Sequence, residues 1–282
     1  MGWRGTRSEA HQMDDRTARK LLRTFPGKFG RRAAVQLGQA FVFGGEEMVN
    51  PEGEPLAMPG GRTPLVTLVG NDVAFKTYLT LVLMTKSPPH DLYRPRMFTE
   101  LAEILAYEVL EPPDYRSGPG TRRVKRAMTL LHKFGLIKMT TNRGEFSVRV
   151  THMPNAETPP FISRPTQLWS HGWLLIMKPP ALAVYMYLRF IGARKGHPVA
   201  IDPYDRARTG LSDDTVARGL RQLGELGIVD QRPAVIEDRY GRRRTHPRAL
   251  LIDDDRIVVD TGTEPVDTRD RWDEQWAAAS NI

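Results

Sequence analysis

The sequence predicts an α+β fold, mainly α-helical with small β-hairpins, built from two similar units. One pattern occurs twice, beginning at Val124 and again at Val216: a helical segment ends at a glycine and passes at once into an aliphatic, strand-like run. Apolar helical segments precede each copy, and two strand-like runs joined by turn residues follow it. Because both units keep the same order of elements, we interpret the chain as an internal duplication.

The repeated helix has one apolar face and stops at a defined point. Apolar residues recur at i, i+3, i+4 and i+7 in the first copy, and these are Val124, Ala127, Met128 and Leu131. This spacing places them on one side of a helix, facing a core. Gly135 and Gly227 follow the two helices, where glycine reverses the chain through a left-handed conformation. The hairpin is therefore expected to start directly after each helix.

Two further helices are expected ahead of the first copy. Residues 72–84 are apolar around most of the helix, which predicts burial, and Asn71 or Asp72 can cap the N-terminus. Residues 98–109 fit a second helix, with Thr99 as the candidate cap. Its inward positions are Leu101, Ile104 and Leu105. Residues 117–120 then provide a tight connection into the repeated helix.

The second unit shows the same order. A buried helix is expected from Pro179 or Pro180 to Ile191, because proline is favourable in the first turn of a helix. Residues 202–209 predict a short second helix. Ser212 is the expected cap of the second repeated helix, with acidic residues in the first turn where the helix dipole favours them.

Each unit ends in a predicted β-hairpin. In the first, residues 136–141 and 145–151 are joined by Asn142-Arg143-Gly144, which is typical turn chemistry. In the second, the strands are expected at residues 228–236 and 249–259. The intervening tip, residues 239–248, contains five arginines and no acidic residue.

These segments predict five regions in a chain of 282 residues, which is long enough for two domains. They are a basic N-terminal extension and linker (1–64), a first domain (65–153), a linker (154–160), a second domain (161–259) and an acidic C-terminal tail (260–282). Residues 16–32 carry seven basic side chains and no acid. This segment fits either a basic arm or a surface helix that packs on the first domain.

Composition favours a polyanionic partner and excludes several classes of site. The formal net charge is +8, although the tail alone holds six acidic residues against two arginines. Cysteine is absent, and neither HExxH nor a phosphate-binding P-loop occurs, so we expect no catalytic residues, no metal and no cofactor. The most apolar segment, residues 172–193, is interrupted by Lys178, Pro179 and Pro180, which indicates a core rather than a membrane span. A cytoplasmic, nucleoid-associated location without membrane contact is expected.

The repeated pattern resembles the winged helix-turn-helix superfamily of DNA-binding proteins. The likeness covers residues 65–151 and 161–259, and residues 210–229 carry it most fully, as turn, recognition helix and wing entry. It implies two tandem winged-helix domains that bind double-stranded DNA. A transcriptional regulator is the first interpretation, and a plasmid-type replication initiator, which also carries two related units, is the second.

Basic and short polar side chains on these elements are the candidate DNA contacts. They lie on the first repeated helix and first turn (Arg122, Arg123, Lys125, Arg126, Thr129, Lys133, Arg143), on the second repeated helix (Thr215, Arg218, Arg221, Gln222) and at the second hairpin tip (Arg239, Arg242, Arg243, Arg244, Arg248). Because Asp213 and Asp214 repel phosphate, we expect the first helix to be the main reader and the arginine tip to enter a minor groove or straddle phosphates. A solvated basic surface with nothing bound is the alternative.

A third hypothesis comes from a different class of protein. Winged helices also bind other proteins, so the chain fits a scaffold or adaptor as well. Trp272 and Trp276 are spaced at i and i+4 in the acidic tail. They can dock on another protein, on a second copy in a homodimer, or on this chain's own basic surface.

Overall fold

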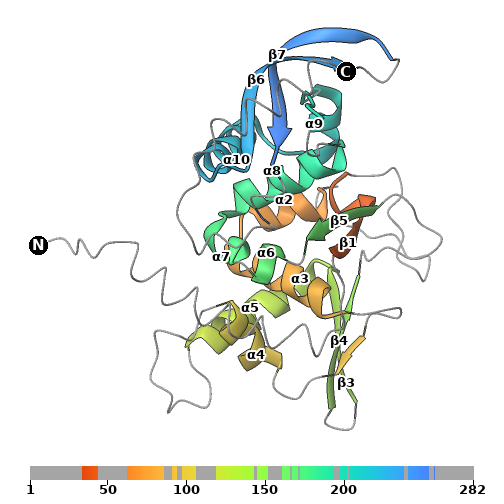
Figure 1. Ribbon diagram of the computed structural model, residues 1–282. Helices are drawn as coiled ribbons and strands as arrows, with labels where there is room; N and C mark the ends of the chain where they lie inside the picture. The colour runs from red at the N-terminus through yellow and green to blue at the C-terminus, as the bar shows by residue number, and fades with distance from the viewer. Residues whose placement is uncertain are drawn as a thin grey trace, which may run out of the picture.

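The computed structural model describes residues 34–43, 62–85, 91–93, 97–105, 119–142, 145–151, 161–165, 167–170, 172–192, 197–201, 203–237, 241–253 and 257 (Figure 1). Helices combine with small antiparallel sheets, as expected for an α+β fold.

Both halves of the chain follow one order: a strand, short helical segments, a long buried helix, an extended segment, two helices and a hairpin. The first half contains β1 (Ala34–Gly38), η1 (Gln39–Phe41), α2 (Pro64–Val69), α3 (Asp72–Met84), β2 (Asp91–Tyr93), α4 (Met97–Ile104), α5 (Pro119–Lys133), β3 (Ile137–Asn142) and β4 (Glu145–Val150). The second contains β5 (Phe161–Pro165), α6 (Gln167–Ser170), α7 (Trp173–Ile176), α8 (Pro179–Phe190), α9 (Pro203–Thr209), α10 (Asp213–Glu225), β6 (Val229–Glu237) and β7 (Arg243–Ile252).

The duplication extends to individual backbone hydrogen bonds. Gly135 and Gly227 both adopt positive φ, 69° and 66°, in the conformation predicted for them. In each copy the next amide donates to the end of the helix, and the residue after the hairpin donates back to that junction. The donor and acceptor pairs are Leu136 with Leu131, Ile228 with Leu223, Thr151 with Leu136, and Asp253 with Ile228.

The sheets match as well. In the first half β4 lies between β2 and β3, and all pairs are antiparallel. In the second half β6 pairs with β7, and Val199 forms a bridge to Leu250 on the free side of β7. This bridge occupies the position that β2 holds in the first half. Each half therefore places a short extended segment against the last strand of its hairpin.

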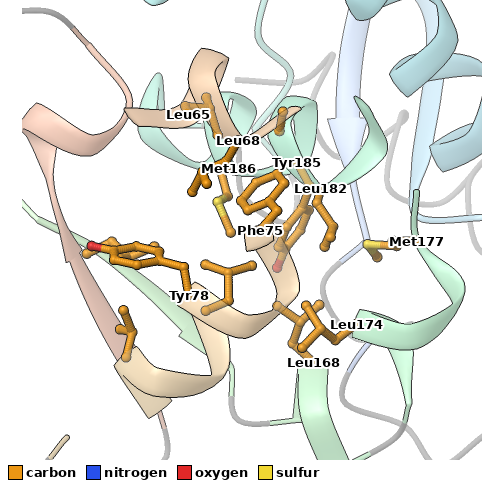
Figure 2. Close-up of a cluster of buried hydrophobic side chains, with 14 of the residues drawn as sticks. Leu65, Leu68, Phe75, Tyr78, Leu168, Leu174, Met177, Leu182, Tyr185 and Met186 are labelled. Carbon is orange, nitrogen blue, oxygen red and sulfur yellow. The ribbon is translucent and has the colours of Figure 1, made fainter. Parts of the chain in front are cut away.

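One core joins the two halves. Buried side chains from α2, α3, α6, α7 and α8 converge in Figure 2, among them Leu65, Phe75, Leu174 and Tyr185. Helix α2 packs against α8 of the other half, and Lys76 on α3 donates to the carbonyl of Leu175 on α7 at 3.2 Å. These contacts are reciprocal, since each half offers a short helical segment to the long helix of the other.

Strands β1 and β5 form the second connection between the halves. They pair antiparallel from Ala34 opposite Pro165 to Gly38 opposite Phe161. Strand β1 also packs on α3, and β5 packs on α8. Strand β1 opens the first half and β5 opens the second, so the two strands are equivalent. Antiparallel pairing of equivalent strands is expected when the two halves are related by an approximate twofold axis.

Tyr78 anchors α3 at the centre of the first half. Its ring stacks on Phe41 with centroids 5.2 Å apart, and its hydroxyl donates to the carbonyl of Thr151 at 2.8 Å. Burial raises the pKa of the Tyr78 phenol well above its usual value, because the phenolate would lose its hydration. The side chain is therefore held as a neutral donor that ties α3 to the end of β4.

Local predictions based on caps and apolar spacing are confirmed. Helix α3 has the predicted bounds, and Asn71 Oδ1 accepts from the amide of Ala74 at 3.0 Å. Helix α8 begins at Pro179 and is buried along most of its length. The inward positions predicted for α4 and α5 are buried: Leu101, Ile104, Leu105, Val124, Ala127, Met128 and Leu131.

Several boundaries were wrong. Thr99 lies inside α4, which starts at Met97, so it is not the cap. Pro119 and Gly120 open helix α5 instead of forming a connection, because proline is well tolerated in the first turn. Helix α2 and strands β1, β2 and β5 were not predicted. Residues 37–43, assigned to the N-terminal extension, add Leu37 and Phe41 to the core.

The second hairpin differs most from its prediction. Strand β7 begins at Arg243 and ends at Ile252, whereas residues 249–259 were expected. Arg243 and Arg244 pair with Glu237 and Ile236, so these arginines belong to the strand and not to a tip. The basic residues 16–32 and the tail 260–282 lie outside the described residues.

Within the described ranges, no helix is both long enough and apolar enough to cross a lipid bilayer.

Candidate nucleic-acid interface

Helix α5 presents a basic face to solvent. Its apolar side packs on α3 and α4, so the opposite side points away from the core. The outward residues are exposed as predicted: Arg122, Arg123, Lys125, Arg126, Thr129 and Lys133. The helix contains no acidic residue, and in the described part of the chain no carboxylate pairs with any of these cations. Phosphate would therefore meet cations that are not already neutralised.

Two side chains on this face have defined local contacts. Lys125 Nζ lies 5.5 Å from the centre of the Phe98 ring on α4, a cation–π contact that holds the ammonium near the outer rim of the helix pair. The Thr129 hydroxyl donates to the carbonyl of Lys125 at 3.1 Å. Its oxygen keeps lone pairs that can accept a hydrogen bond from a base or a water molecule.

Helix α10 is the counterpart of α5 in the second half, but unlike α5 it carries two aspartates in its first turn. Asp213 pairs with Arg206 of α9 at 2.6 Å, and Asp214 pairs with Arg218 one turn later at 2.8 Å. Ser212 Oγ accepts from the amide of Thr215 at 3.2 Å, so the predicted cap is confirmed. Asp214 thus neutralises Arg218, the first arginine of α10, while Asp213 neutralises Arg206 of α9. Arg221 remains as the exposed cation of α10 with no ion pair among the described residues.

Two candidates on α10 are structural. Thr215 is only 8% exposed, and its hydroxyl lies 2.9 Å from Ser212 Oγ. Gln222 Oε1 accepts from the amide of Lys178 at 2.9 Å, and its Nε2 donates to the carbonyl of Ile176 at 3.3 Å. Both side chains hydrogen-bond within the fold, which argues against the prediction that they read bases.

Replacing Gln222 with alanine is expected to destabilise the protein and to leave DNA affinity unchanged. Two hydrogen bonds to the α7–α8 junction are lost, at about 1 kcal/mol each, so urea unfolding should show a loss of about 2 kcal/mol. Arg221→Ala is the control, because that neighbouring side chain is exposed and its loss should leave stability unchanged. A larger loss of DNA affinity in Gln222→Ala than in Arg221→Ala would contradict this assignment.

The second hairpin carries the other basic cluster. Arg242, Arg243, Arg244 and Arg248 are exposed, as predicted. Because successive strand residues face opposite sides, Arg243 and Arg244 project from opposite faces of the ribbon. The ribbon can therefore contact phosphates on either side of a groove. The register shifts between Arg232 and Ala234, which bends the outer part of the ribbon relative to its base. Arg143 and Arg239 lie outside the described residues.

Sequence reasoning missed the ion pairs of α10. The spacing of Asp214 and Arg218 at i and i+4 was a usable signal, since residues four apart lie on the same helix face. The pair between Arg206 and Asp213 joins two helices and carried no such local signal.

No protein-family model, curated protein or solved structure matches this chain. Among the described residues, no group of three or more histidine, aspartate or glutamate side chains is arranged to hold a metal ion.

Proposed function

We propose that this protein binds double-stranded DNA through two winged-helix units, with α5 as the main recognition helix. The supporting observation is the outer face of α5, where exposed cations are unopposed by any acidic residue of the helix. Such a face suits a groove bordered by phosphates.

The topology supports the same proposal. Each half runs helix, extended segment, helix, helix and hairpin, and the extended segment pairs with the last strand. This is the arrangement of a winged helix, in which the third helix enters a major groove about 12 Å wide and the hairpin lies beside it. The proposal therefore assigns α5 and α10 as the two recognition helices, and β3–β4 and β6–β7 as the two wings.

The two recognition helices are unequal. Helix α5 offers five basic side chains, whereas α10 neutralises Arg218 with its own Asp214. We propose a transcriptional regulator in which α5 and the second wing supply most of the contacts to DNA. A replication initiator is the second candidate, because two different readers in one chain can occupy adjacent grooves of a site that is not palindromic. Footprints on direct repeats near an origin favour the initiator, and a promoter-overlapping palindrome favours the regulator.

Selection of bound sequences from a random duplex pool tests DNA binding directly. We expect one motif to be enriched, and its symmetry will indicate how the two units are used. If six basic contacts form, a plot of the logarithm of affinity against the logarithm of salt concentration should have a slope of about −5. No enrichment, together with no duplex binding at low salt, would overturn the proposal and favour a protein-binding adaptor.

Removing the wing arginines is expected to weaken DNA binding and flatten the salt dependence. Arg242→Ala, Arg243→Ala and Arg244→Ala together remove up to three phosphate contacts, so the slope should fall by about 3. Fluorescence anisotropy on the selected duplex measures both quantities. Gln231→Ala with Thr245→Ala, two exposed neutral residues of the same hairpin, is the control. Equal affinities for the two variants would exclude the second wing from the interface.

A further inference from the structure

The turn between α9 and α10 rests on the first half of the chain. The Thr63 hydroxyl donates to the carbonyl of Thr209 at 2.9 Å, although 146 residues separate the two. Val66 lies against the same turn, since a methyl group added at Gly210 would be 3.4 Å from its Cγ2. Helix α2, which contains Val66, also packs on α8 (Figure 1). One helix of the first half therefore contacts both α8 and the turn that leads into α10.

The hydrogen bond from Thr63 supplies a partner that the end of α9 needs. Thr209 is the last residue of α9, and the final carbonyls of a helix have no partner within it. Thr209 is 0% exposed and Thr63 is 3% exposed, so bulk water is excluded from this carbonyl. A buried carbonyl without a hydrogen bond is strongly disfavoured. The position of Thr209 is therefore tied to that of Thr63.

The two threonine hydroxyls also organise the helix ends on either side of this bond. Thr63 Oγ1 accepts from the amide of Val66 at 3.2 Å and so caps α2. Thr209 Oγ1 donates to the carbonyl of Arg206 at 2.7 Å and accepts from the amide of Leu211 at 3.1 Å. A hydroxyl can donate one hydrogen bond and accept two, so each role is compatible with the others. Hydrogen bonds thus connect the first turn of α2 to the turn before α10.

A second contact from the first half holds the last turn of α9. The centre of the Phe43 ring lies 4.8 Å from the guanidinium carbon of Arg208. Phe43 is buried and meets Tyr187 and Phe190 of α8 edge to face, with ring centroids 6.1 and 4.8 Å apart. Its ring therefore contacts α8 and α9 at once. A rotation of α9 relative to the first half would disrupt the contacts of both Phe43 and Thr63.

We propose that Thr63 is a positioning residue for α10, and that the protein binds DNA sites with one fixed spacing between the segments contacted by its two units. This inference rests on the proposed function and deepens it. In a helix-turn-helix, the short turn sets the direction of the second helix relative to the first. Because the first half holds this turn, α10 keeps one distance and one angle to α5.

The spacing of the DNA site tests the fixed separation without any substitution. Each base pair inserted between the two contacted segments moves one of them about 3.4 Å along the helix axis and about 35° around it. From the selected duplex and its footprint, we expect insertion of five base pairs to lower affinity about 100-fold, because both units can no longer engage at once. Insertion of ten restores the face of the duplex but adds about 34 Å, so affinity should stay low. Recovery at ten base pairs would indicate flexibly linked units and would overturn the fixed spacing.

Hydrogen–deuterium exchange of the full-length protein tests the role of Thr63 independently of DNA. Thr63→Val keeps the shape of the side chain but removes its hydroxyl, so exchange of the Gly210 and Leu211 amides should become about tenfold faster. Thr63→Ser keeps the hydroxyl and should behave like the parent. Thr67→Val is the matched control, because the Thr67 hydroxyl donates at 3.1 Å to the carbonyl of Thr63, within the start of α2. Protected amides in α3 and α8 will show that each variant is folded.

The same variants distinguish positioning from stability on DNA. Thr63→Val is expected to reduce, several-fold, the ratio of affinities for the parent spacing and for a spacing longer by one base pair, because α10 gains freedom to adjust. A smaller folded fraction would lower both affinities equally. An unchanged ratio, or unchanged exchange at Gly210 and Leu211, would overturn the positioning role. If the parent binds no duplex, the proposed function and the fixed spacing both fail, whereas faster exchange in Thr63→Val would still show that Thr63 holds the turn.

Discussion

Replacing Arg122 and Arg126 with glutamine is expected to lower affinity for the selected duplex about 30-fold. The two guanidinium groups lie one turn apart on the exposed face of α5, and no carboxylate in the described part of the chain neutralises them. Each contact to a base or phosphate contributes about 1 kcal/mol or more, so two contribute about 2 kcal/mol. Fluorescence anisotropy at fixed salt measures the change.

The control for this experiment changes net charge equally at another place. Arg62→Gln with Lys178→Gln removes two exposed cations next to α2 and α8, near the junction of the halves. This variant should lose little affinity, because long-range attraction is screened over about 8 Å at physiological salt. Equal losses in the two variants would mean that net charge, and not the face of α5, determines binding.

Replacing Gly219 with alanine is expected to destabilise the protein by about 2 kcal/mol. A methyl group at this position of α10 would lie 2.5 Å from the carbonyl oxygen of Pro180 and 2.5 Å from Val184 Cγ2. Since the first neighbour is backbone, α10 must move away from α8, and overpacking of this kind costs up to about 3 kcal/mol. The better helix propensity of alanine returns about 1 kcal/mol. Urea unfolding measures the net loss.

Gly224 provides a matched control on the same helix. A methyl group there would lie 3.7 Å from the carbonyl oxygen of Val229, an ordinary contact, and the position is exposed. Gly224→Ala should therefore stabilise the protein by up to about 1 kcal/mol through helix propensity alone. The close approach of α10 to α8 would be disproved if both alanine variants were stabilised equally.

The repeat shows why this contact belongs to the second half alone. Ala127 occupies in α5 the place that Gly219 occupies in α10, and it is buried at 3% exposure. The first half thus accommodates a methyl group where the second half does not. Helix α10 therefore approaches α8 more closely than α5 approaches its neighbours in the first half. The backbone hydrogen bonds that follow α5 and α10 are nevertheless equivalent.

The sequence predicted those features whose causes are local. Asn71 and Ser212 cap helices because a short polar side chain reaches an amide three residues ahead. Gly135 and Gly227 end helices because their positive φ is easy for glycine. The exposed cations of α5 followed from helical spacing, since its inner face is clearly apolar.

Features with distant causes were missed. Strands β1 and β5 are short and pair across more than half of the described chain, so neither carries a hairpin signal. Gln222 falls on the polar side of α10 by spacing, but the α7–α8 junction lies against it and uses both ends of its amide. Arg243 and Arg244 continue a strand because β6 offers them partners, which their own sequence does not indicate.

The pairing of β1 with β5 has a consequence for synthesis on the ribosome. Residues 34–38 emerge early, but their partner strand emerges only with residues 161–165, after the whole first half has left the exit tunnel. Until then β1 lacks its partner strand, and the apolar surface of α2 lacks α8. Contacts so far apart in sequence slow folding, so we expect the nascent first half to keep this apolar surface uncovered until the second half has been made.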